Sequence, residues 1–470
     1  MNLQSAMAQT ISERLARFIA DLTVEKLPAD AIVVAKLCFL DWLGSAIAGG
    51  TTRSTRMFVQ VAKGLGGKPQ ATLIPDGSKT SCHLAALVNA ASSHVVEMDD
   101  LHKPSVLHPA APVIPAALAV AERDGISGAE LLAAIVAGYE VAIRAGEALG
   151  PSHYHFWHTT GTCGVFGAAA AAGKLLRLTP EQLVWALGSA GTQSAGLWEF
   201  LVEGAMSKQL HPAKATANGL LAALLAQQGL TGALQIFEGE KGLGRATSAA
   251  PDLARLTEGL GDYPPRIVEN SFKAHAACYH IHSTIDAAID LRARFNLKPA
   301  ESRKITVRLY SAGLDLLEKV EPMSSYAAKF SIPYCIATAL VKGRVALDDF
   351  TEEGIRDETI RQLMSHVVLQ RDPELAQVYP DTWPAIVTVE TAAGARHETR
   401  VDYPKGDPKN PMTREELIDK FHVLTRRIIP EASRLLLIER CLTLDTLENV
   451  QKLWEGVDLR PGSSPTTDDH

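Results

Sequence analysis

The chain has 470 residues, of which 46 are basic and 53 acidic, so its formal net charge at pH 7 is −7. At roughly 150 residues per domain, this length predicts about three domains, and two large ones fit as well. Apolar residues make up 46% and charged residues 21%, which is typical of a soluble globular protein and excludes wholesale disorder. The mild acidity, without clustered Lys and Arg, excludes a nucleic-acid-binding surface.

The cysteines and the apolar stretches indicate the compartment. The spacing of the cysteines, with no CxxC pair, predicts reduced thiols in a cytoplasm-like environment rather than a disulfide framework. The N-terminal stretch MNLQSAMAQTISERLARF becomes charged and amphipathic before a secretory signal could form. The stretches CFLDWLGSAIAGG and GVFGAAAAAGKLL are shorter than the roughly 18 residues of a membrane span. We therefore expect a soluble, cytoplasmic protein with no membrane partner. The six cysteines are Cys38, Cys82, Cys163, Cys278, Cys335 and Cys441.

Helical periodicity dominates the first half of the chain. Apolar residues recur at threes and fours in SERLARFIADL, and the pattern continues over residues 30–47. Pro112 and Pro115 occupy positions where a helix could begin, and Gly125 supplies a stop signal. Together these patterns predict a series of helices from the start of the chain.

Helix caps and small residues extend this pattern. Ser127 can cap the next helix with Glu130 as its capping-box partner, and Thr179 followed by proline begins another helix. Ala and Gly are so frequent over residues 161–173 and 213–226 that these helices are expected to pack closely, backbone to backbone. The simplest interpretation is an all-helical core.

The pattern changes after about residue 265. Residues 304–310 alternate apolar and polar side chains, as in a half-buried strand, and residues 385–403 read as a hairpin with its turn around Gly394. Helices are expected at about 279–294 and 333–342.

From Met412 onward the helical period returns. The predicted fold class is therefore mainly α, with a large all-helical domain built from both chain ends and a smaller α+β lid domain. The predicted boundaries are 1–265 and 404–460 for the helical domain, 266–403 for the lid domain and 461–470 for a flexible tail.

Several standard motifs are absent. The sequence contains no Walker P-loop, no GxGxxG after a strand, no GxSxG nucleophile elbow and no HExxH. Nucleotide-dependent, nicotinamide-dependent and serine hydrolase chemistry therefore lose most of their support, and any reaction must come from side chains.

The first stretch that could carry chemistry is EMDDLHKPSVLHP, residues 97–109. Its carboxylates, imidazoles and lysine form a polar loop that leads into a proline-started helix, whose N-terminus offers positive potential to an anion. A carboxylate beside an imidazole fixes the histidine tautomer and raises its basicity. The alternatives are a solvated loop with a capping aspartate, or a metal site, whose ligands would be Asp99, Asp100, His102 and His108.

Three further stretches contain candidate groups. In HYHFWHTTGTCG we interpret His158 as an acid or base, with a structural histidine or a zinc site as alternatives, and Cys163 as a packing residue. In MSKQLHPAK, Lys208 could hold a carboxylate or an oxyanion, unless it lies in a solvated turn. In KAHAACYHIH, His275 and His280 are expected in the core or at the surface. The sequence leaves open whether this last stretch is extended or helical.

Four stretches together resemble the MmgE/PrpD family over nearly the whole chain: DDLHKPSVLHPAAPVIPAALAVAE, WHTTGTCGVFGAAAAAGKLL, SKQLHPAKATANGLLAALLAQQGLTG and AKFSIPYCIATAL. This family contains 2-methylcitrate dehydratase, cis-aconitate decarboxylase and iminodisuccinate epimerase. The resemblance implies a helical domain from both termini, an α+β lid domain and a homodimer. It also implies an active site between the domains that uses no metal and no organic cofactor.

The resemblance also implies the site residues, position by position. The implied catalytic residues are His108, His158, Lys208, Asp99 and Asp100. The implied substrate-binding residues are Glu97, His102, Lys273 and His282.

The chain departs from the family patterns at several positions. Decarboxylase-like relatives carry Asp and Thr where this chain has Glu97 and Leu101. Dehydratases carry an Asn-Asp-Thr loop and a later His-Pro-Ser-Asp, whereas this chain has Asp-Asp-Leu and His-Pro-Ala. Because both hallmarks are altered, we expect a different branch of the family.

The shared demand of these reactions is proton transfer at a carbon next to a carboxylate. A base or acid must handle the proton, and cations must hold the growing negative charge. We hypothesise that His108 and His158 exchange the proton, that Lys208 and Lys273 bind carboxylates, and that Asp99 or Asp100 orients an imidazole.

The sequence favours a cofactor-independent epimerase or isomerase of the iminodisuccinate type, acting on a small di- or tricarboxylate. The alternatives are a dehydratase of a 2-methylcitrate-like hydroxy acid and a cis-aconitate-type decarboxylase. A small-acid binding protein or scaffold is the non-enzymatic alternative.

Overall fold

The structure is a computed structural model, and it describes residues 9–203 and 205–460. The described chain forms two compact units. Unit 1 contains the residues up to Val95, Pro104–Asn270 and the chain from Leu417, and unit 2 contains Val96–Lys103 and Ser271–Glu416. Compact units and independently folding domains need not coincide, so the boundaries predicted at 265 and 403 stay predictions. The tail predicted at 461–470 lies outside the described residues.

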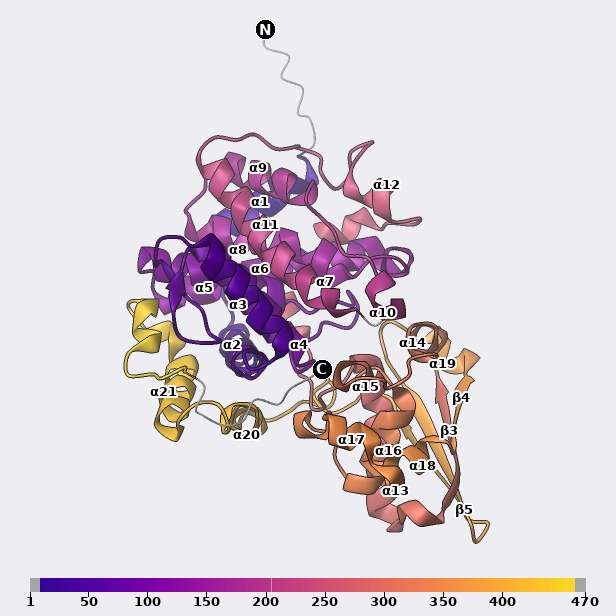
Figure 1. Cartoon of the computed structure of the whole chain (residues 1–470). Helices are drawn as coiled ribbons and strands as arrows, with labels where there is room; N and C mark the ends of the chain where they lie inside the picture. Colours follow the sequence, from indigo (N-terminus) through magenta and orange to yellow (C-terminus); the bar gives the residue numbers. More distant parts are fainter. Residues whose placement is uncertain (1–8, 204, 461–470) are drawn as a thin grey trace. The chain divides into compact units, whose positions relative to one another are not determined.

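Unit 1 consists of helices and one very short ladder (Figure 1). The ladder pairs β1 (Ala71–Thr72) with β2 (Lys79–Thr80), so the expectation of an all-helical unit is wrong in this detail. The helices are α1 (Ile11–Asp21), α2 (Ala29–Gly49), α3 (Arg53–Leu65), α4 (Cys82–Val95), α5 (Ala110–Asp124), α6 (Gly128–Tyr154), α7 (Thr159–Thr162), α8 (Gly164–Leu175), α9 (Pro180–Gly191), α10 (Glu199–Glu203), α11 (Leu210–Gln227), α12 (Leu243–Thr247), α20 (Arg414–Thr425) and α21 (Glu431–Leu442).

The core of unit 1 depends on close helix crossings. Helix α8 packs against α5, α6 and α11, and α11 also packs against α4 and α9. At the α6–α8 crossing, a Cβ on Gly138 would lie 2.5 Å from a Val113 methyl, and a Cβ on Gly167 would lie 2.6 Å from the Gly138 carbonyl oxygen. A Cβ on Gly219 of α11 would likewise lie 2.5 Å from the Val165 carbonyl oxygen. The predicted backbone-to-backbone packing is therefore confirmed, because no larger residue fits at these positions.

The helix ends follow the sequence signals with two exceptions. Ser127 caps α6, but Glu130 Oε2 accepts from the Ser127 hydroxyl and not from the Ser127 backbone N–H, so the predicted capping box is incomplete. Thr179 and Gln182 form a capping box at α9, and Gly125 ends α5 in the left-handed conformation. Helix α5 begins at Ala110, earlier than Pro112 or Pro115, because these prolines fall within a helix that Pro109 caps. Only Pro115 is far enough from the first turn to cost a backbone hydrogen bond.

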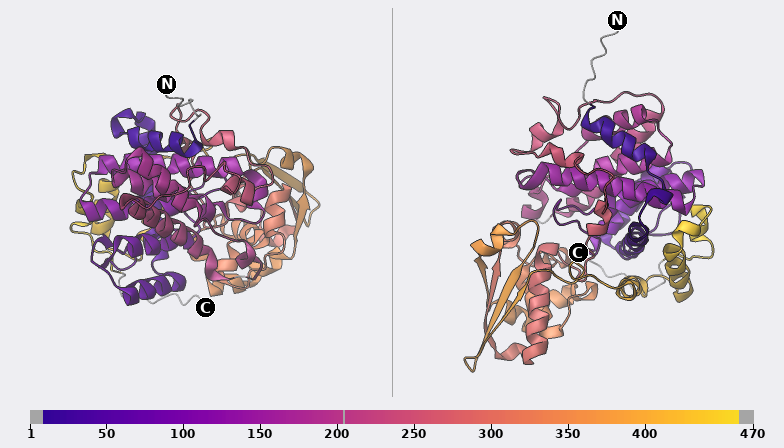
Figure 2. Two further views of the ribbon diagram at one scale, coloured as in Figure 1. Left: turned by 90° about the horizontal axis from the view of Figure 1, so that it is seen from above. Right: turned by 180° about the vertical axis from the view of Figure 1, so that it is seen from behind.

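Helix α2 has the length and apolar character of a membrane span, alone among the described helices. However, 72% of its most apolar window is buried in the protein, which is also typical of a soluble core helix. Its Asp41 is buried and pairs with Lys420 of α20, with Oδ1 and Nζ 2.5 Å apart. Helix α21 also packs against α2, and Figure 2 shows the C-terminal helices in yellow from two further sides. Both chain ends thus contribute to unit 1.

Unit 2 contains a four-stranded sheet with the order β4-β3-β5-β6. Strand β3 (Ser302–Leu309) pairs in parallel with β4 (Val367–Arg371) and antiparallel with β5 (Ala385–Thr391), which forms a hairpin with β6 (Arg396–Val401). The predicted strand and hairpin are confirmed, while β4 was not predicted. The side chains of Val307, Val387 and Val389 are buried in the hydrophobic core of unit 2.

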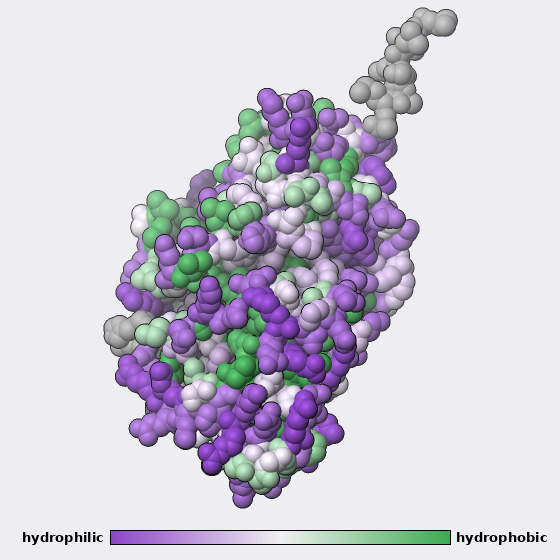
Figure 3. All heavy atoms as spheres, turned by 90° about the vertical axis from the view of Figure 1, so that its right-hand side faces the viewer, coloured by the Kyte–Doolittle hydropathy of each residue, from purple (hydrophilic) through white to green (hydrophobic). Residues whose placement is uncertain are grey.

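In unit 2, helix α13 packs against the hairpin strands β5 and β6 and against α16, whereas α14 contacts β4 at the other edge of the sheet (Figure 1, orange). The helices of this unit are α13 (His282–Phe295), α14 (Ser311–Leu317), α15 (Ser325–Ala328), α16 (Ile332–Lys342), α17 (Glu352–Arg356), α18 (Glu358–Met364) and α19 (Pro373–Gln377). On the face shown in Figure 3, hydrophilic side chains predominate and apolar ones gather only in small groups. The mainly helical fold class is confirmed, and the lid role of the second domain stays a prediction.

Candidate active site

Four imidazoles meet inside unit 1. His94 lies in the last turn of α4, His108 two residues before α5, His158 directly before α7 and His211 in the first turn of α11. The ring of His94 lies 5.0 Å from that of His108 and 5.6 Å from that of His158, measured between centroids. The rings of His108 and His158 are 6.4 Å apart. Four separate segments therefore bring their imidazoles to one place.

The hydrogen-bonding partner of His158 is His211. Their Nδ1 atoms are 3.0 Å apart, and the ring of Trp198 covers His158 at a centroid distance of 4.8 Å. The backbone N–H of His158 donates to the carbonyl of Gly196 at 2.9 Å. Gly196 has a φ of +142°, and a Cβ there would lie 3.3 Å from His211 Nδ1. Glycine at this position thus allows both histidines to approach.

The backbone of the His108 segment is held by two threonines. The backbone N–H of His108 donates to Thr160 Oγ1 at 3.1 Å, and the Thr159 hydroxyl donates to the carbonyl of Val106. Val106 is β-branched yet has a φ of +48°, a strained conformation that the surrounding contacts must maintain. Such strain is common where a loop places functional groups.

The electrostatics favour a neutral imidazole at His158 and at His211. Burial lowers the pKa of His158 well below its ordinary value, and His211, His94, Lys208 and His108 lower it further. Burial also lowers the pKa of His211 to about 4, with the neighbouring positive charges adding to the effect. A neutral imidazole at pH 7 can accept or donate a proton.

Lys208 brings a positive charge close to these neutral rings. It lies in the short 3₁₀ turn Met206–Gln209 and is only 3% exposed, so the solvated turn considered from the sequence is wrong. A buried ammonium group in a low-dielectric environment attracts an anion strongly.

A pocket of about 370 Å³ lies next to the cluster, entirely within unit 1. Its lining includes Gln193, Phe200, His211 and Lys214. His211 is half-buried and Lys214 is exposed, whereas His158 is only 2% exposed. His211 is therefore the member of the pair that faces the pocket.

The acidic loop belongs to unit 2. Glu97 has a φ of +56° and, like Asp99, is buried. Lys273 Nζ donates to Glu97 Oε2 at 3.0 Å and lies 3.7 Å from Asp99 Oδ1. The Tyr326 hydroxyl donates to Glu97 Oε1 at 3.2 Å. Two buried carboxylates thus surround one fully buried ammonium group.

The pKa shifts in this network agree with a buried ion cluster in which the charge of Lys273 is compensated by the two carboxylates. Burial alone would lower the pKa of Lys273, but the charges of Glu97 and Asp99 raise it above the ordinary value. Burial, together with the same two carboxylates, raises the pKa of Tyr326 well above its ordinary value. Nearby, Lys329 Nζ donates to the carbonyl of Val96 at 3.0 Å, which fixes the start of the loop.

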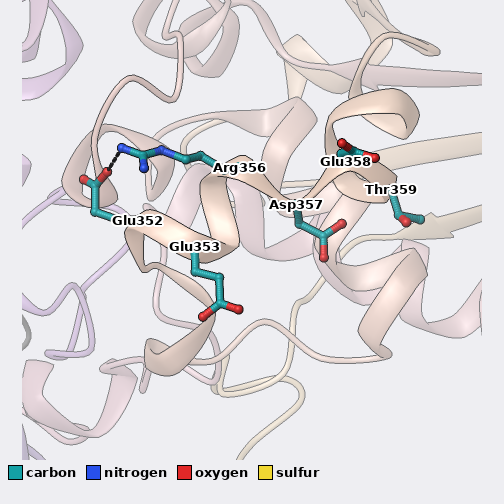
Figure 4. Close-up of a pocket in the computed structure, with 6 residues that line it drawn as sticks. All are labelled: Glu352, Glu353, Arg356, Asp357, Glu358 and Thr359. Carbon is teal, nitrogen blue, oxygen red and sulfur yellow. Dashed lines mark hydrogen bonds and ion pairs between the residues drawn. The ribbon is translucent and has the colours of Figure 1, made fainter.

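A larger hollow in unit 2 lacks the chemistry of the imidazole cluster. It has a volume of about 650 Å³ and lies at α17 and α18 (Figure 4). Four carboxylates line it, and Arg356 contacts one of them, Glu352, at 2.8 Å. Its negative charge would repel a carboxylate substrate. The lining residues are Glu352, Glu353, Arg356, Asp357, Glu358 and Thr359.

Comparison with known proteins gives the family. The profile of the MmgE/PrpD N-terminal domain matches residues 13–256, and that of the MmgE/PrpD C-terminal domain matches residues 275–444. The chain belongs to the MmgE/PrpD family. Similar family members include a cis-aconitate decarboxylase of Aspergillus terreus, 28% identical over 476 residues that cover 95% of each chain.

Two further relatives show the range of the family. The human cis-aconitate decarboxylase is 28% identical over 490 residues, which cover 98% of this chain and 96% of the relative. A 2-methylcitrate dehydratase of Salmonella typhimurium is 25% identical over 297 residues, which cover 60% of this chain and 61% of the relative. These MmgE/PrpD proteins are lyases that act on small carboxylic acids, as their names say. The family predicted from the sequence is confirmed.

The structure brings some of the residues predicted for an MmgE/PrpD site together. In unit 1 it joins His108 and His158, with Lys208 as an electrostatic neighbour of His158. In unit 2 it joins Glu97 and Asp99 through Lys273. Asp100 and His102 are buried in the same loop. The roles assigned to these residues stay predictions.

The histidines of the last predicted stretch lie in the core of unit 2. His282 begins α13, its Nε2 lies 3.3 Å from the Ala277 carbonyl oxygen, and its ring stacks on Tyr279. His280 lies in the preceding 3₁₀ turn and stacks on Trp383 at 4.1 Å. The chain is helical from Tyr279 onward, whereas residues 273–278 form neither helix nor strand, and His275 and His280 are both buried.

The zinc site considered as an alternative for the HYHFWHTTGTCG stretch is not supported. His153 has both ring nitrogens engaged, Nε2 with Thr162 Oγ1 at 2.7 Å and Nδ1 with the Thr247 carbonyl at 3.2 Å. It is therefore a structural histidine rather than one ligand of a zinc site. Burial raises the pKa of Cys163 to about 12, which agrees with a packing role.

Two members of the imidazole cluster were missed at the sequence level. His94 lies in the regular helix α4, outside every stretch with a dense set of polar residues. His211 lies within the SKQLHPAK stretch, yet only the fold shows that it contacts His158. The sequence did offer one indication for His211. It lies three residues after Lys208, a spacing of about one helical turn that brings two side chains to the same face of a helix.

Proposed function

We propose that this protein is a lyase that decarboxylates a small, cis-aconitate-like tricarboxylate. The observation that carries this proposal is the cluster of buried imidazoles beside Lys208, which supplies a proton donor and a cation. The decarboxylase relatives cover nearly the whole chain, whereas the dehydratase relative covers 60% of it. The comparisons therefore favour the lyase alternatives over the epimerase that the sequence alone favoured.

Decarboxylation makes two demands on the protein. When the C–C bond breaks and CO₂ leaves, the electron pair stays on a carbon that is conjugated with a remaining carboxylate. A cation must hold the charge that develops on that carboxylate, and we assign this role to Lys208. A proton must then reach the carbon, and we assign its delivery to the neutral imidazole of His158, with His108 as the second ring close by.

The acidic loop of unit 2 carries Glu97 where decarboxylase-like relatives have Asp, and Leu101 where they have Thr. Lys273, predicted as a substrate ligand, has its charge matched by Glu97 and Asp99, so we assign it to the support of the loop.

The test is incubation with candidate acids in D₂O, followed by NMR. Cis-aconitate, 2-methylcitrate and an imino-dicarboxylate are offered separately. Decarboxylation gives CO₂ and one deuteron on the product carbon, dehydration gives loss of the hydroxyl group, and epimerisation gives deuterium in the substrate without loss of either. The first outcome supports the proposal, and either of the others replaces it with another reaction of this family.

Two variants connect the activity to the site. His158→Gln is expected to lower kcat by about 10²-fold or more, the usual contribution of a positioned acid or base. His155→Gln is the matched control, because His155 is exposed and lies in the same stretch but outside the cluster. Turnover of none of these acids, or equal activity of the two variants, would refute the proposed function.

A further inference from the structure

The proton donor of the proposed reaction has little access to water. His158 is 2% exposed, and its neighbours within unit 1 are His94 on α4, His108, Lys208, His211 on α11 and Trp198. A decarboxylation consumes one proton per turnover at the product carbon, so a buried donor must be recharged. The only hydrogen bond that the structure describes for the ring of His158 runs from Nδ1 to His211.

The contact between the two rings constrains their protons. Two Nδ1 atoms 3.0 Å apart form a hydrogen bond only if one of them carries a proton and the other does not. Burial lowers the pKa of both rings, which favours the neutral form with one proton on each ring at pH 7. The tautomers of His158 and His211 are therefore coupled. When His158 holds its proton on Nε2, His211 holds its own on Nδ1, and the reverse state has both protons exchanged.

The surroundings of His211 complete the path. His211 is half-buried and lines the 370 Å³ pocket, together with the exposed side chains of Lys214 and Glu199. Its ring is the one polar group of the described residues that touches both His158 Nδ1 and this pocket. Gly196, whose Cβ would crowd His211 Nδ1, keeps the two rings in contact.

We propose that His211 is a positioning residue that fixes the tautomer of His158 and carries protons between it and the water of the adjacent pocket. This inference rests on the proposed function, since it assigns the proton supply of the same site. It identifies a second imidazole and a solvent route that are separate from the groups that touch the substrate.

The proton balance of the relay is closed. His158 Nε2–H gives its proton to the product carbon, His211 Nδ1–H gives its proton to His158 Nδ1, and His211 Nε2 takes a proton from a water or buffer acid in the pocket. Each ring then carries one proton again, with the tautomers exchanged. After the product leaves, each ring moves its own proton back to its first nitrogen through water that enters the emptied site and the pocket, so no proton is lost and the one consumed at carbon has come from the pocket.

The kinetic test separates positioning from relay. His211→Ala removes both functions, whereas His211→Asn keeps an amide that can pair with His158 Nδ1 but cannot pass a proton. We expect kcat to fall about 10²-fold in His211→Ala with KM within twofold, and free imidazole added to the assay to restore at least a tenth of the lost rate. His211→Asn is expected to retain the pH profile of the parent with a kcat at least tenfold lower. His155→Ala is the matched histidine control with unchanged kcat.

A second measurement does not depend on turnover. In protein labelled with ¹⁵N in its histidine rings, long-range ¹H–¹⁵N spectra report the protonation of each ring nitrogen, and His158→Gln and His211→Ala assign the two rings. We expect one protonated Nδ1 and one bare Nδ1 within this pair, and a changed signal of His158 in His211→Ala.

The outcomes distinguish the two proposals. If the wild-type protein turns over none of the acids, the proposed function fails, and the spectra alone decide whether the coupled pair exists. If kcat is unchanged in His211→Ala, or if it falls without any rescue by imidazole, the relay is refuted. Spectra in which neither Nδ1 of the pair carries a proton would refute it as well.

Discussion

Replacement of Lys273 by Met tests whether this residue stabilises the acidic loop or binds the substrate. The methionine keeps the length of the side chain and removes its charge. Glu97 and Asp99 would then remain buried with their shared cation gone, while the Tyr326 hydroxyl would still donate to Glu97. We therefore expect a loss of stability in unit 2.

The size of the loss follows from the burial of all three groups. Removal of one partner from a buried ion pair costs about 3–5 kcal/mol, because the other charge stays desolvated. For a unit of roughly 150 residues, each kcal/mol lowers Tm by about 2–4 °C, so the expected decrease is about 6–20 °C.

Thermal unfolding measured by circular dichroism checks this expectation, with Lys304→Met as the matched control. Lys304 lies 4.0 Å from Glu390 on the exposed side of the sheet, and both side chains are about half exposed, so its loss should cost less than about 1 kcal/mol. The double variant Glu97→Gln/Lys273→Met should recover part of the loss, because one uncompensated carboxylate is gone. Equal Tm values for Lys273→Met and Lys304→Met would refute the structural role and return Lys273 to the substrate-binding role predicted from the sequence.

Three further predictions concern unit 1. Gly196→Ala should lower kcat by roughly tenfold or more, because its Cβ lies 3.3 Å from His211 Nδ1 and must displace that ring; Gly64→Ala, whose Cβ meets no atom within 4 Å, should leave steady-state kinetics unchanged. Burial lowers the pKa of His153 and of His211 to about 4, so the unfolded chain binds more protons below pH 6.5. These two rings should therefore leave the free energy of unfolding unchanged above pH 6.5. Between pH 6.5 and 4 each ring should lower it by at most about 1.4 kcal/mol per pH unit. The free energy of unfolding, measured with urea at several pH values, should fall less steeply between pH 6.5 and 4 in His153→Gln than in the wild type. An identical pH dependence would contradict the lowered pKa of His153. A thiol reagent should modify none of the six buried cysteines quickly in the native protein and all of them in denaturant, since burial raises the pKa of the Cys163 thiol to about 12; rapid native labelling would contradict this.

The fold was predictable where the local pattern was strong. The patterns over residues 304–310 and 385–403 correspond to β3, β5 and β6; burial roughly alternates along β3 and β6, whereas the first five residues of β5 are all buried. Strand β4 was missed because it is an exposed edge strand, so its sequence carries no alternation that burial would impose. The start of α5 was misplaced because a proline can lie within the first turn of a helix as well as at its first position.

The candidate site was predictable only for groups that stand in dense polar stretches. His108, His158 and Lys208 were found there, but His94 occupies an apolar helix, and nothing in its neighbourhood distinguishes it from a core histidine. The partner of Lys273 could not be predicted either, because Glu97 lies 176 positions earlier in the chain. Contacts of this kind depend on the tertiary fold and leave no local periodicity.

The proton balance connects the imidazole pair to the choice among reactions. An epimerase removes and returns one proton at the same carbon, so the coupled tautomers of His158 and His211 would exchange twice per cycle and draw no proton from solvent overall. A dehydratase removes a proton from carbon and delivers one to the departing hydroxyl, which also balances within the site. A decarboxylase alone must import a proton in every turnover. A buried donor joined to a half-buried imidazole at a pocket meets that demand directly, so the arrangement of His158 and His211 agrees with the reaction that the decarboxylase relatives suggest.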